Sequence, residues 1–369
     1  MPQPAPDLLA WFDRHRRDLP WRRTRDPYRI WLSEVMLQQT RVEVVLPYYE
    51  RFLARFPTIE ELAAAGIDEV LALWSGLGYY RRARQLHAAA RQVAASGGFP
   101  STLDGWLALP GVGAYTAAAV ASIAFGVAVP VLDGNVERVL SRWLALAADP
   151  RSSGARRELL AAAAGLLAAE RPGDSNQALM ELGATLCTPR RPKCLLCPLA
   201  SGCRAAAAGD PEIYPAAKAK RESEKRRLVV AVAEREERVL LFRRPDDSSL
   251  LAGTWELPWV GEDGDAAPEP ALACRYGGIW RLGPRLAEVR HGITYRDLEI
   301  AVHRAEVAEA PFAAEAAGWF DAAGRKGLAV SSLVGKVLRA VERGATPPAA
   351  SSAPGADPPA RRSRSRRPG

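Results

Sequence analysis

The sequence predicts a multidomain protein in which an all-α domain is followed by a smaller α+β domain. Three observations support this fold class. Apolar residues recur at helical spacing through the first half of the chain, and strand-like alternation is scarce there. Four cysteines lie close together in residues 187–203. Beyond them, short segments rich in Val, Leu, Ile and Trp alternate with turns, which is typical of strands. The 369 residues are enough for two domains.

The elements are expected in a definite order. Residues 7–186 are predicted to be almost wholly helical, with breakers such as Pro57 and Gly66 between the helices. The strands expected in the second domain are 228–234, 238–244, 254–260 and 297–307, followed by a closing helix near 331–342. The predicted division is a first domain, a charged linker, a second domain and a disordered basic tail, at residues 1–204, 205–227, 228–343 and 344–369.

Composition and charge limit the classes of partner. Hydrophobic residues make up 48% and charged residues 25% of the chain, an ordinary globular composition. The formal net charge is +8, with five arginines in residues 361–367. This balance favours a polyanionic partner, nucleic acid first, although a basic protein without such a partner fits the charge equally well. We expect a cytoplasmic protein, because the sequence has no signal peptide and no apolar run of bilayer length.

The clustered cysteines are the most specific feature. They follow the spacing C-x6-C-x2-C-x5-C, and in a reducing compartment such a group indicates a metal or cluster rather than disulfides. A structural zinc site usually has two close cysteine pairs, and only one such pair is present here. The four candidate ligands are Cys187, Cys194, Cys197 and Cys203. The isolated Cys274 is expected to be a small buried residue.

Two further segments carry candidate chemistry. In residues 107–125, Gly111 and Gly113 lie in a turn before a helix, where exposed backbone N–H groups can hold a phosphate; a plain helical hairpin is the alternative. Asp133 and Asn135 precede another helix, as N-caps or as a catalytic carboxylate and its neighbour. Glu34 shares a helix face with apolar residues. Burial there would raise its pKa, as a general acid requires, whereas a salt bridge would make it structural.

Together these segments resemble the adenine DNA glycosylases of the MutY type, members of the helix-hairpin-helix superfamily that includes endonuclease III. The resemblance is densest through residue 204 and is carried by segments 18–22, 26–52, 74–87, 109–126 and 131–140 and by the cysteine loop. It implies an all-α helix-hairpin-helix glycosylase domain with a [4Fe–4S] cluster in the loop 187–203. It also implies a Nudix-like second domain, most clearly through the match at residues 250–260.

The resemblance implies hydrolysis of the N-glycosidic bond of adenine opposite 8-oxoguanine or guanine in duplex DNA, a step of base excision repair. Glu34 matches the family's catalytic acid and Asp133 the carboxylate that stabilises the sugar cation. Tyr115 and Asn135 match residues that support them by hydrogen bonding. Endonuclease III-type enzymes carry a lysine at position 115 that forms a Schiff base, so the tyrosine predicts a monofunctional glycosylase.

Further positions match residues that contact the flipped base, the lesion pair or the DNA backbone. By resemblance these are Trp21, Arg22 and Gln177 in the adenine pocket, Gln39, Thr40 and Tyr79 at the lesion pair, and Gly111 and Gly113 in the hairpin. The partner expected is mispaired duplex DNA in the nucleoid, bound by a monomer. Two alternatives are an endonuclease III-like enzyme for oxidised pyrimidines and a non-catalytic DNA-binding or electron-transfer protein.

The second domain departs from the related families at two places. It lacks the R-E-x-x-E-E run with which Nudix hydrolases bind magnesium, so we expect a recognition module rather than a pyrophosphatase. Where well-known members of the glycosylase family carry Phe-Ser-His, this chain has Ile293, Thr294 and Tyr295. Thr294 keeps a hydroxyl for contact with the lesion. The resemblance therefore leaves the preference for 8-oxoguanine over guanine open.

Overall fold

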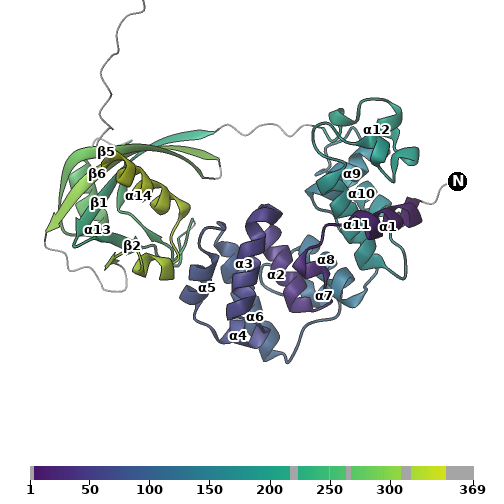
Figure 1. The fold of residues 1–369 in the computed structure, drawn as a ribbon, viewed down its shortest axis with the longest axis horizontal. Coiled ribbons are helices and arrows are strands. Elements are labelled where there is room, and N and C mark those ends of the chain that lie inside the picture. The colour runs from purple at the N-terminus through teal and green to yellow at the C-terminus, as the bar shows by residue number, and fades with distance from the viewer. Residues whose placement is uncertain are drawn as a thin grey trace, which may run out of the picture.

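The computed structural model describes residues 4–216, 223–248, 250–262, 267–293, 295–308 and 317–345. A helical region, residues 4–216, precedes an α+β region, residues 223–345, as the fold class predicted (Figure 1). Thr294 and the tail beyond residue 345 lie outside the described residues. Within the described part of the chain, no helix is long and apolar enough to cross a membrane.

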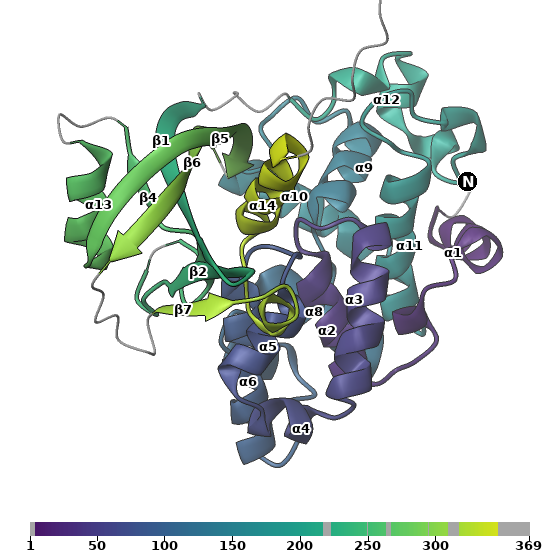
Figure 2. The same cartoon turned by 60° about the vertical axis from the view of Figure 1, so that its left-hand side comes forward.

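The helical region has two lobes that meet at α8 and α11 (Figures 1 and 2). One lobe contains α2 Pro27–Leu37, α3 Val42–Arg55, α4 Ile59–Ala64, α5 Ile67–Trp74, α6 Arg81–Ala95, α7 Leu103–Leu107 and α8 Ala114–Phe125. The other contains α1 Pro4–His15, α9 Gly134–Leu144, α10 Ser153–Gly165, α11 Pro172–Thr185 and the short α12 Arg204–Ala207. A short 3-10 turn at Pro20–Arg22 joins α1 to the first lobe.

Helix α2 is the centre of the first lobe. Its N-cap is Asp26, whose carboxylate accepts hydrogen bonds from the backbone N–H groups of Tyr28 and Arg29, and Pro27 occupies the first turn, where its missing N–H costs nothing. Nearly all of its residues are buried, and the Trp31 ring packs edge-on against Trp106 at 5.7 Å. Close packing around most of this helix holds its buried side chains in fixed positions.

The hairpin before α8 forms as the sequence predicts. Thr102 caps α7 through the N–H of Gly105, and α8 begins directly after Gly113. Gly111 has a φ of +73°, and a Cβ there would lie 2.5 Å from the Cβ of Gln85. Only glycine therefore fits this turn without strain.

The α+β region is built on one seven-stranded mixed sheet. Its main strand order is β3-β2-β1-β6-β5, with β4 beside β1 and β7 beside β2; β1 and β6 run parallel, and the other pairs are antiparallel. The strands are β1 Glu224–Arg235, β2 Arg238–Arg243, β3 Trp255–Glu256, β4 Trp259–Gly261, β5 Ile279–Ile293, β6 Arg296–Ala308 and β7 Ala317–Phe320.

Two helices cover opposite faces of this sheet (Figure 2). On β1, Leu228 and Val230 pack with α14 Ser332–Ala345, while Val229 packs with α13 Pro268–Tyr276. Both sides of the strand are therefore buried, which explains why its central residues form a continuous apolar run rather than an alternating one.

Several expectations need correction. Strand β5 and helix α13 were not predicted, because Gly283, Pro284 and alternating charges mask the strand signal. The expected linker 205–227 is partly structured: Glu224 and the residues after it pair in parallel with β6. The start of β1 was not predicted as strand because residues 224–227 are all charged. Cys274 is exposed rather than buried, because it lies on α13 away from the side that Leu272 turns to the sheet.

Candidate functional site

A cleft of about 1130 Å³ opens between the two lobes of the helical region. Its walls come from the Pro20–Arg22 turn, α2, α8, the start of α9 and α11. It gathers most of the residues singled out from sequence: Trp21, Arg22, Glu34, Gln39, Thr40, Gly111, Gly113, Tyr115, Asp133, Asn135 and Gln177. Tyr79 is the exception among the described candidates for catalysis and DNA contact in this region, since it lines a neighbouring cleft.

Glu34 lies on the buried face of α2, and the residue is only 6% exposed. The Tyr115 hydroxyl donates a hydrogen bond of 2.6 Å to its Oε2. Burial raises the pKa of Glu34 to about 7, against the hydrogen bond from Tyr115 and the charge of Arg22, which lower it; the nearby negative charge of Asp133 raises it further. At neutral pH this carboxyl is therefore protonated in a large fraction of molecules.

Asp133 is the N-cap of α9, which confirms one of the two roles that the sequence suggested for this residue. Its Oδ1 accepts from the backbone N–H groups of Asn135 at 3.0 Å and Val136 at 2.7 Å, and its Oδ2 from the Asn135 side-chain amide at 3.1 Å. Burial raises the pKa of Asp133 above its ordinary value, but these three hydrogen bonds and the nearby Arg138 favour the ionised form. Asp133 thus accepts three hydrogen bonds that favour its ionised form, whereas Glu34 accepts one, from Tyr115.

Arg138 connects Asn135 to the cysteine loop. Its guanidinium donates to the Asn135 Oδ1 at 2.9 Å, to the Gly183 carbonyl at 2.8 Å and to the Cys187 carbonyl at 2.8 Å. Because Asn135 in turn donates to Asp133, one chain of hydrogen bonds joins the cleft to the loop. Sequence reasoning did not single out Arg138, which looks like any helical arginine.

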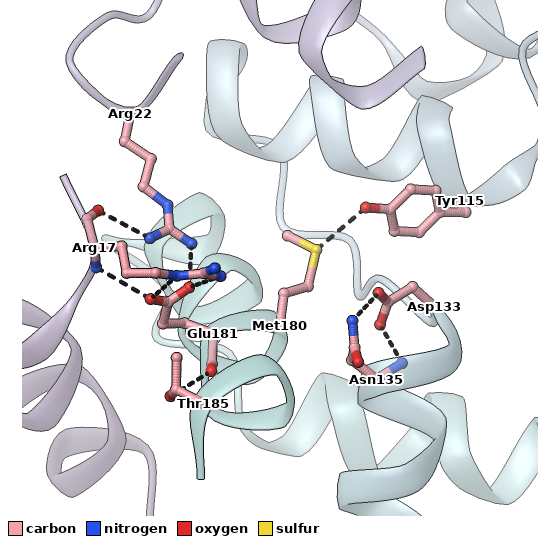
Figure 3. A network of polar contacts seen from close by, with 8 residues as sticks. All are labelled: Arg17, Arg22, Tyr115, Asp133, Asn135, Met180, Glu181 and Thr185. Atoms are coloured by element: carbon pink, nitrogen blue, oxygen red, sulfur yellow. Dashed lines mark hydrogen bonds and ion pairs between the residues drawn. The ribbon is translucent and has the colours of Figure 1, made fainter. Parts of the chain in front are cut away.

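A second network fixes the opposite wall of the cleft (Figure 3). Glu181 on α11 is fully buried and accepts from the guanidinium groups of Arg17 and Arg22, each at 2.8 Å. Burial alone would raise the pKa of Glu181, but the two arginines lower it to about 2, so the carboxylate is ionised. In Figure 3 Met180 lies between this network and Tyr115, whose hydroxyl is 3.2 Å from its sulfur. The sequence analysis did not identify Glu181, because no pattern in the neighbouring residues indicates that this glutamate is buried.

Arg82 is a third residue that the sequence analysis did not identify, after Arg138 and Glu181. It joins two loops of the first lobe. Its guanidinium donates to the carbonyls of Gln38 at 2.6 Å and Gly78 at 3.2 Å, and to the Thr40 hydroxyl at 3.2 Å. The residue is 8% exposed, and burial lowers its pKa to about 10, so it stays charged. It therefore fixes the spacing between the loop at 38–40 and the loop at 77–79.

A second cleft, of about 990 Å³, lies between the helical and α+β regions. Gln39, Tyr79, Gly111 and Gly113 line its helical side, and His291, Ile293 and Trp259 line the other side. Its arginines include Arg81, Arg226, Arg244 and Arg296. Since Gln39 and the two glycines line both clefts, the two clefts adjoin each other. The chain thus offers one continuous groove with a carboxyl-lined recess.

In the α+β region the carboxylate of Glu256 is neutralised. It pairs with Arg244 at 2.7 Å and Arg275 at 3.5 Å, and the residue is 9% exposed. A carboxylate engaged by two arginines is a poor ligand for a divalent cation.

The four clustered cysteines line one apolar cavity beside α9. None of the four forms a disulfide, and all four are half-buried. Arg142 anchors the loop by donating to the Thr188 carbonyl at 2.7 Å and to the Cys187 Sγ at 3.3 Å. A four-cysteine donor set facing one dry cavity, with a cation beside it, fits a [4Fe–4S] cluster. Among the described residues, no three potential ligands converge as those of a single metal ion would. A four-iron cluster, which binds each cysteine through a different iron, has no need of such convergence.

Comparison with protein families identifies three matching segments. Residues 32–163 match the HhH-GPD superfamily of base excision DNA repair proteins, residues 187–203 the iron–sulfur binding domain of endonuclease III, and residues 228–340 the NUDIX domain. The order of the three matches is the order of the helical lobes, the cysteine loop and the sheet.

Among curated proteins, the chain is similar to the adenine DNA glycosylases of several organisms. It is 37% identical to that of Mus musculus over an alignment of 402 positions, gaps included, which covers 91% of this chain and 77% of the relative. It is 47% identical over 209 residues to that of Mycolicibacterium smegmatis, covering 56% of this chain and 70% of the relative. For the Homo sapiens protein the identity is 40% over 309 residues, and the match spans 56% of that protein's length.

Among solved structures, a thermostable thymine-DNA glycosylase resembles the helical region. The TM-score is 0.51 at 32% identity, and the match covers 55% of this chain and 95% of that one.

Proposed function

The chain belongs to the adenine DNA glycosylase family, and on that premise we propose that it hydrolyses the N-glycosidic bond of adenine mispaired with 8-oxoguanine or guanine in duplex DNA. The observation that carries the proposal is the pair of carboxyls in one cleft, Glu34 with a pKa raised to about 7 and Asp133 with a carboxylate that accepts hydrogen bonds from three N–H groups. One fold thus supplies an acid and an anion at neutral pH.

Glu34 is the proposed general acid. An adenine anion is a poor leaving group, so a proton must reach N7 of the base as the bond to the sugar breaks. The protonated Glu34 supplies it. The Tyr115 hydroxyl orients the carboxyl and stabilises the carboxylate left after transfer. The enclosed position of Glu34 on α2 excludes water that would otherwise stabilise the unreactive ionised form.

Asp133 is the proposed electrostatic stabiliser. When the base leaves, the sugar carries positive charge, and a fixed carboxylate lowers the energy of that state. The start of α9 and Asn135 hold Asp133 in place, and Arg138 holds Asn135. A water molecule then adds to the sugar carbon and loses a proton to the carboxylate left on Glu34, which leaves an abasic site, free adenine and the reprotonated acid.

The base has to leave the duplex to reach this recess, at a cost of about a few kcal/mol. Trp21, Arg22 and Gln177 line the recess and are proposed to contact the adenine. Gln39, Thr40 and Tyr79, on the two loops that Arg82 joins, are proposed to fill the gap at the mispair. Gly111 and Gly113 present backbone N–H groups to a phosphate.

The reaction is proposed to stop at hydrolysis. Tyr115 occupies the hairpin position where a lysine amine would attack the sugar, and a phenol cannot form a Schiff base. Tyr115 instead donates its hydrogen bond to Glu34. This argues against an endonuclease III-like lyase.

The α+β region is proposed to recognise the opposite base. It forms one side of the arginine-bearing cleft, with His291 and Ile293 next to position 294. The chain carries a [4Fe–4S]-binding loop at residues 187–203, and we propose Cys187, Cys194, Cys197 and Cys203 as its ligands. A bound cluster would order the basic loop, and Arg190, Arg191 and Lys193 in that loop would then be placed to meet phosphates of the DNA backbone. We propose a monomer acting on nucleoid DNA.

Strand scission after alkali on a labelled duplex with adenine opposite 8-oxoguanine tests the proposal. Wild-type protein should produce a single break at the adenine. Glu34→Gln should bind the duplex but release no adenine, whereas Glu61→Gln, on the exposed start of α4, should cut as wild type does. Normal turnover by the Glu34 variant would refute the assigned acid. Equal single-turnover rates on 8-oxoguanine and guanine mispairs would refute lesion preference alone.

A further inference from the structure

The α+β region is fastened to the helical region through a short backbone segment. The Val330 carbonyl accepts hydrogen bonds from the Tyr80 hydroxyl at 2.6 Å and the Ser75 hydroxyl at 3.1 Å, and the Val330 N–H lies 3.3 Å from the same Ser75 oxygen. The preceding residue, Ala329, is 4% exposed and belongs to the hydrophobic core of the helical region. We call Ser75, Tyr80 and Val330 the latch.

The latch holds the sheet directly. The Trp255 N–H of β3 donates to the Ala329 carbonyl at 2.8 Å, and Trp255 forms an isolated parallel bridge with Val330. Because the accepting group is backbone and not a flexible side chain, a shift of Val330 moves β3 with it.

A second contact lies one turn further along α6. Arg84 donates to the Asp246 carboxylate at 2.8 Å and to the Ala252 carbonyl at 3.1 Å. Gly253 has a φ of +63°, and a Cβ there would come within 1.9 Å of the Arg84 guanidinium. Asp246, Ala252 and Gly253 thus lie against the surface of α6.

Tyr80 is the sequence neighbour of the aromatic residue at the mouth of the groove. Tyr79 is 46% exposed, has a φ of +51° and faces the cleft between the two regions. Arg82 fixes the loop at 77–79 from within the helical region, since its guanidinium lies 5.3 Å from the Tyr79 ring and donates to the Gly78 carbonyl. The latch contacts the next residue, Tyr80, from the α+β region.

We propose that Tyr80 is a positioning residue. Its hydroxyl, together with Ser75, docks the α+β region through the Val330 carbonyl. That docking fixes both the width of the groove and the placement of Tyr79. Undocking leaves Glu34 and Asp133 undisturbed, because they lie in the other cleft, but it loosens the surface that receives DNA.

Hydrogen exchange of the free protein tests the docking without any assumption about function. Tyr80→Phe removes one bond to the Val330 carbonyl and leaves Ser75 as the partner of the Val330 N–H. Faster exchange of that amide therefore reports opening of the segment. A net hydrogen bond of ordinary strength predicts about fivefold faster exchange in peptides covering residues 328–332. Tyr28→Phe is the matched control, since its buried hydroxyl bonds the Phe56 carbonyl within the helical region. Unchanged exchange in Tyr80→Phe would overturn the latch.

Binding tests the positioning role, which rests on the proposed function. The probe is a duplex with 8-oxoguanine opposite 2′-fluoro-2′-deoxyadenosine, an analogue that resists excision. Tyr80→Phe should weaken binding about fivefold, while the single-turnover rate at saturating enzyme on cleavable adenine stays within about twofold of wild type. Faster exchange with unchanged affinity would overturn the positioning role. If wild-type protein itself fails to prefer the mispaired duplex, the proposed function fails, and the exchange result still decides the docking.

Discussion

Tyr115→Phe should move the pH dependence of adenine excision in a direction that the geometry fixes. The Tyr115 hydroxyl donates to Glu34 and so favours the carboxylate over the protonated acid. Removing the donor should therefore raise the pKa of Glu34. The acid must be protonated to act, so the rate should fall as pH rises through that pKa, and in the variant this fall should begin at higher pH.

The magnitude follows from the strength of the bond. A hydrogen bond to a charged group contributes about 1.5 kcal/mol, and one pKa unit corresponds to about 1.4 kcal/mol. The midpoint should move from about 7 in wild type to about 8 in the variant. Between pH 6 and pH 8 the wild-type rate should fall about tenfold and the variant rate only about twofold.

The assay is single-turnover excision at saturating enzyme, measured from pH 5.5 to 9 on one mispaired duplex. The plateau at low pH and the midpoint are fitted separately, because a lowered plateau alone reports general damage to the site. Tyr28→Phe, whose hydroxyl bonds the Phe56 carbonyl away from the cleft, should keep the wild-type midpoint. An unchanged or lowered midpoint in Tyr115→Phe would refute the assignment of Glu34 as the titrating acid held by Tyr115.

Four further predictions concern the buried ion pair, the hairpin turn, the cysteine loop and the absence of lyase chemistry. Glu181→Gln should destabilise the fold by about 3 kcal/mol at pH 7 in urea unfolding, since it leaves two arginines without their buried partner. Its carboxylate has a folded pKa lowered to about 2, so this stability is fully present above the ordinary value of 4.5 and is lost as pH falls through 2; a pH-independent difference would contradict the ion-pair account. Gly111→Ala should weaken duplex binding and lower the melting temperature through strain at positive φ, whereas Gly113→Ala, with open space around its Cβ, should keep the melting temperature; equal melting temperatures would argue against strain. Cys197→Ser should lose iron and visible absorbance together, and metal analysis of wild type should find iron; zinc in place of iron would exclude the cluster. Borohydride should trap little or no covalent complex of wild-type protein with DNA, and efficient trapping would exclude a monofunctional mechanism.

Local patterns were enough to predict much of the helical region. The cap at Thr102, the glycine turn and the start of α8 follow from short-range sequence, because caps and turns depend on residues only a few positions apart. The apolar face of α2 was also predicted, but the pattern left open whether Glu34 on that face is buried or salt-bridged, and the structure shows it buried. In the α+β region the same reasoning missed β5, since a strand with charges on an open face and a bulge near Gly283 lacks a clear alternating pattern.

By itself the sequence determined the order of the two regions, the cysteine loop and the helix start at Asp133, but it left open whether Glu34 is buried or salt-bridged at the surface. Only the tertiary structure brought Glu34 and Asp133, 99 positions apart in the sequence, to one cleft, and only it supplied the long-range partners of Glu181 and Arg82. The physical reason is the range of the forces. Caps, turns and helix faces are decided within a few residues, whereas the pKa of a buried carboxyl depends on groups that chain folding brings from distant segments.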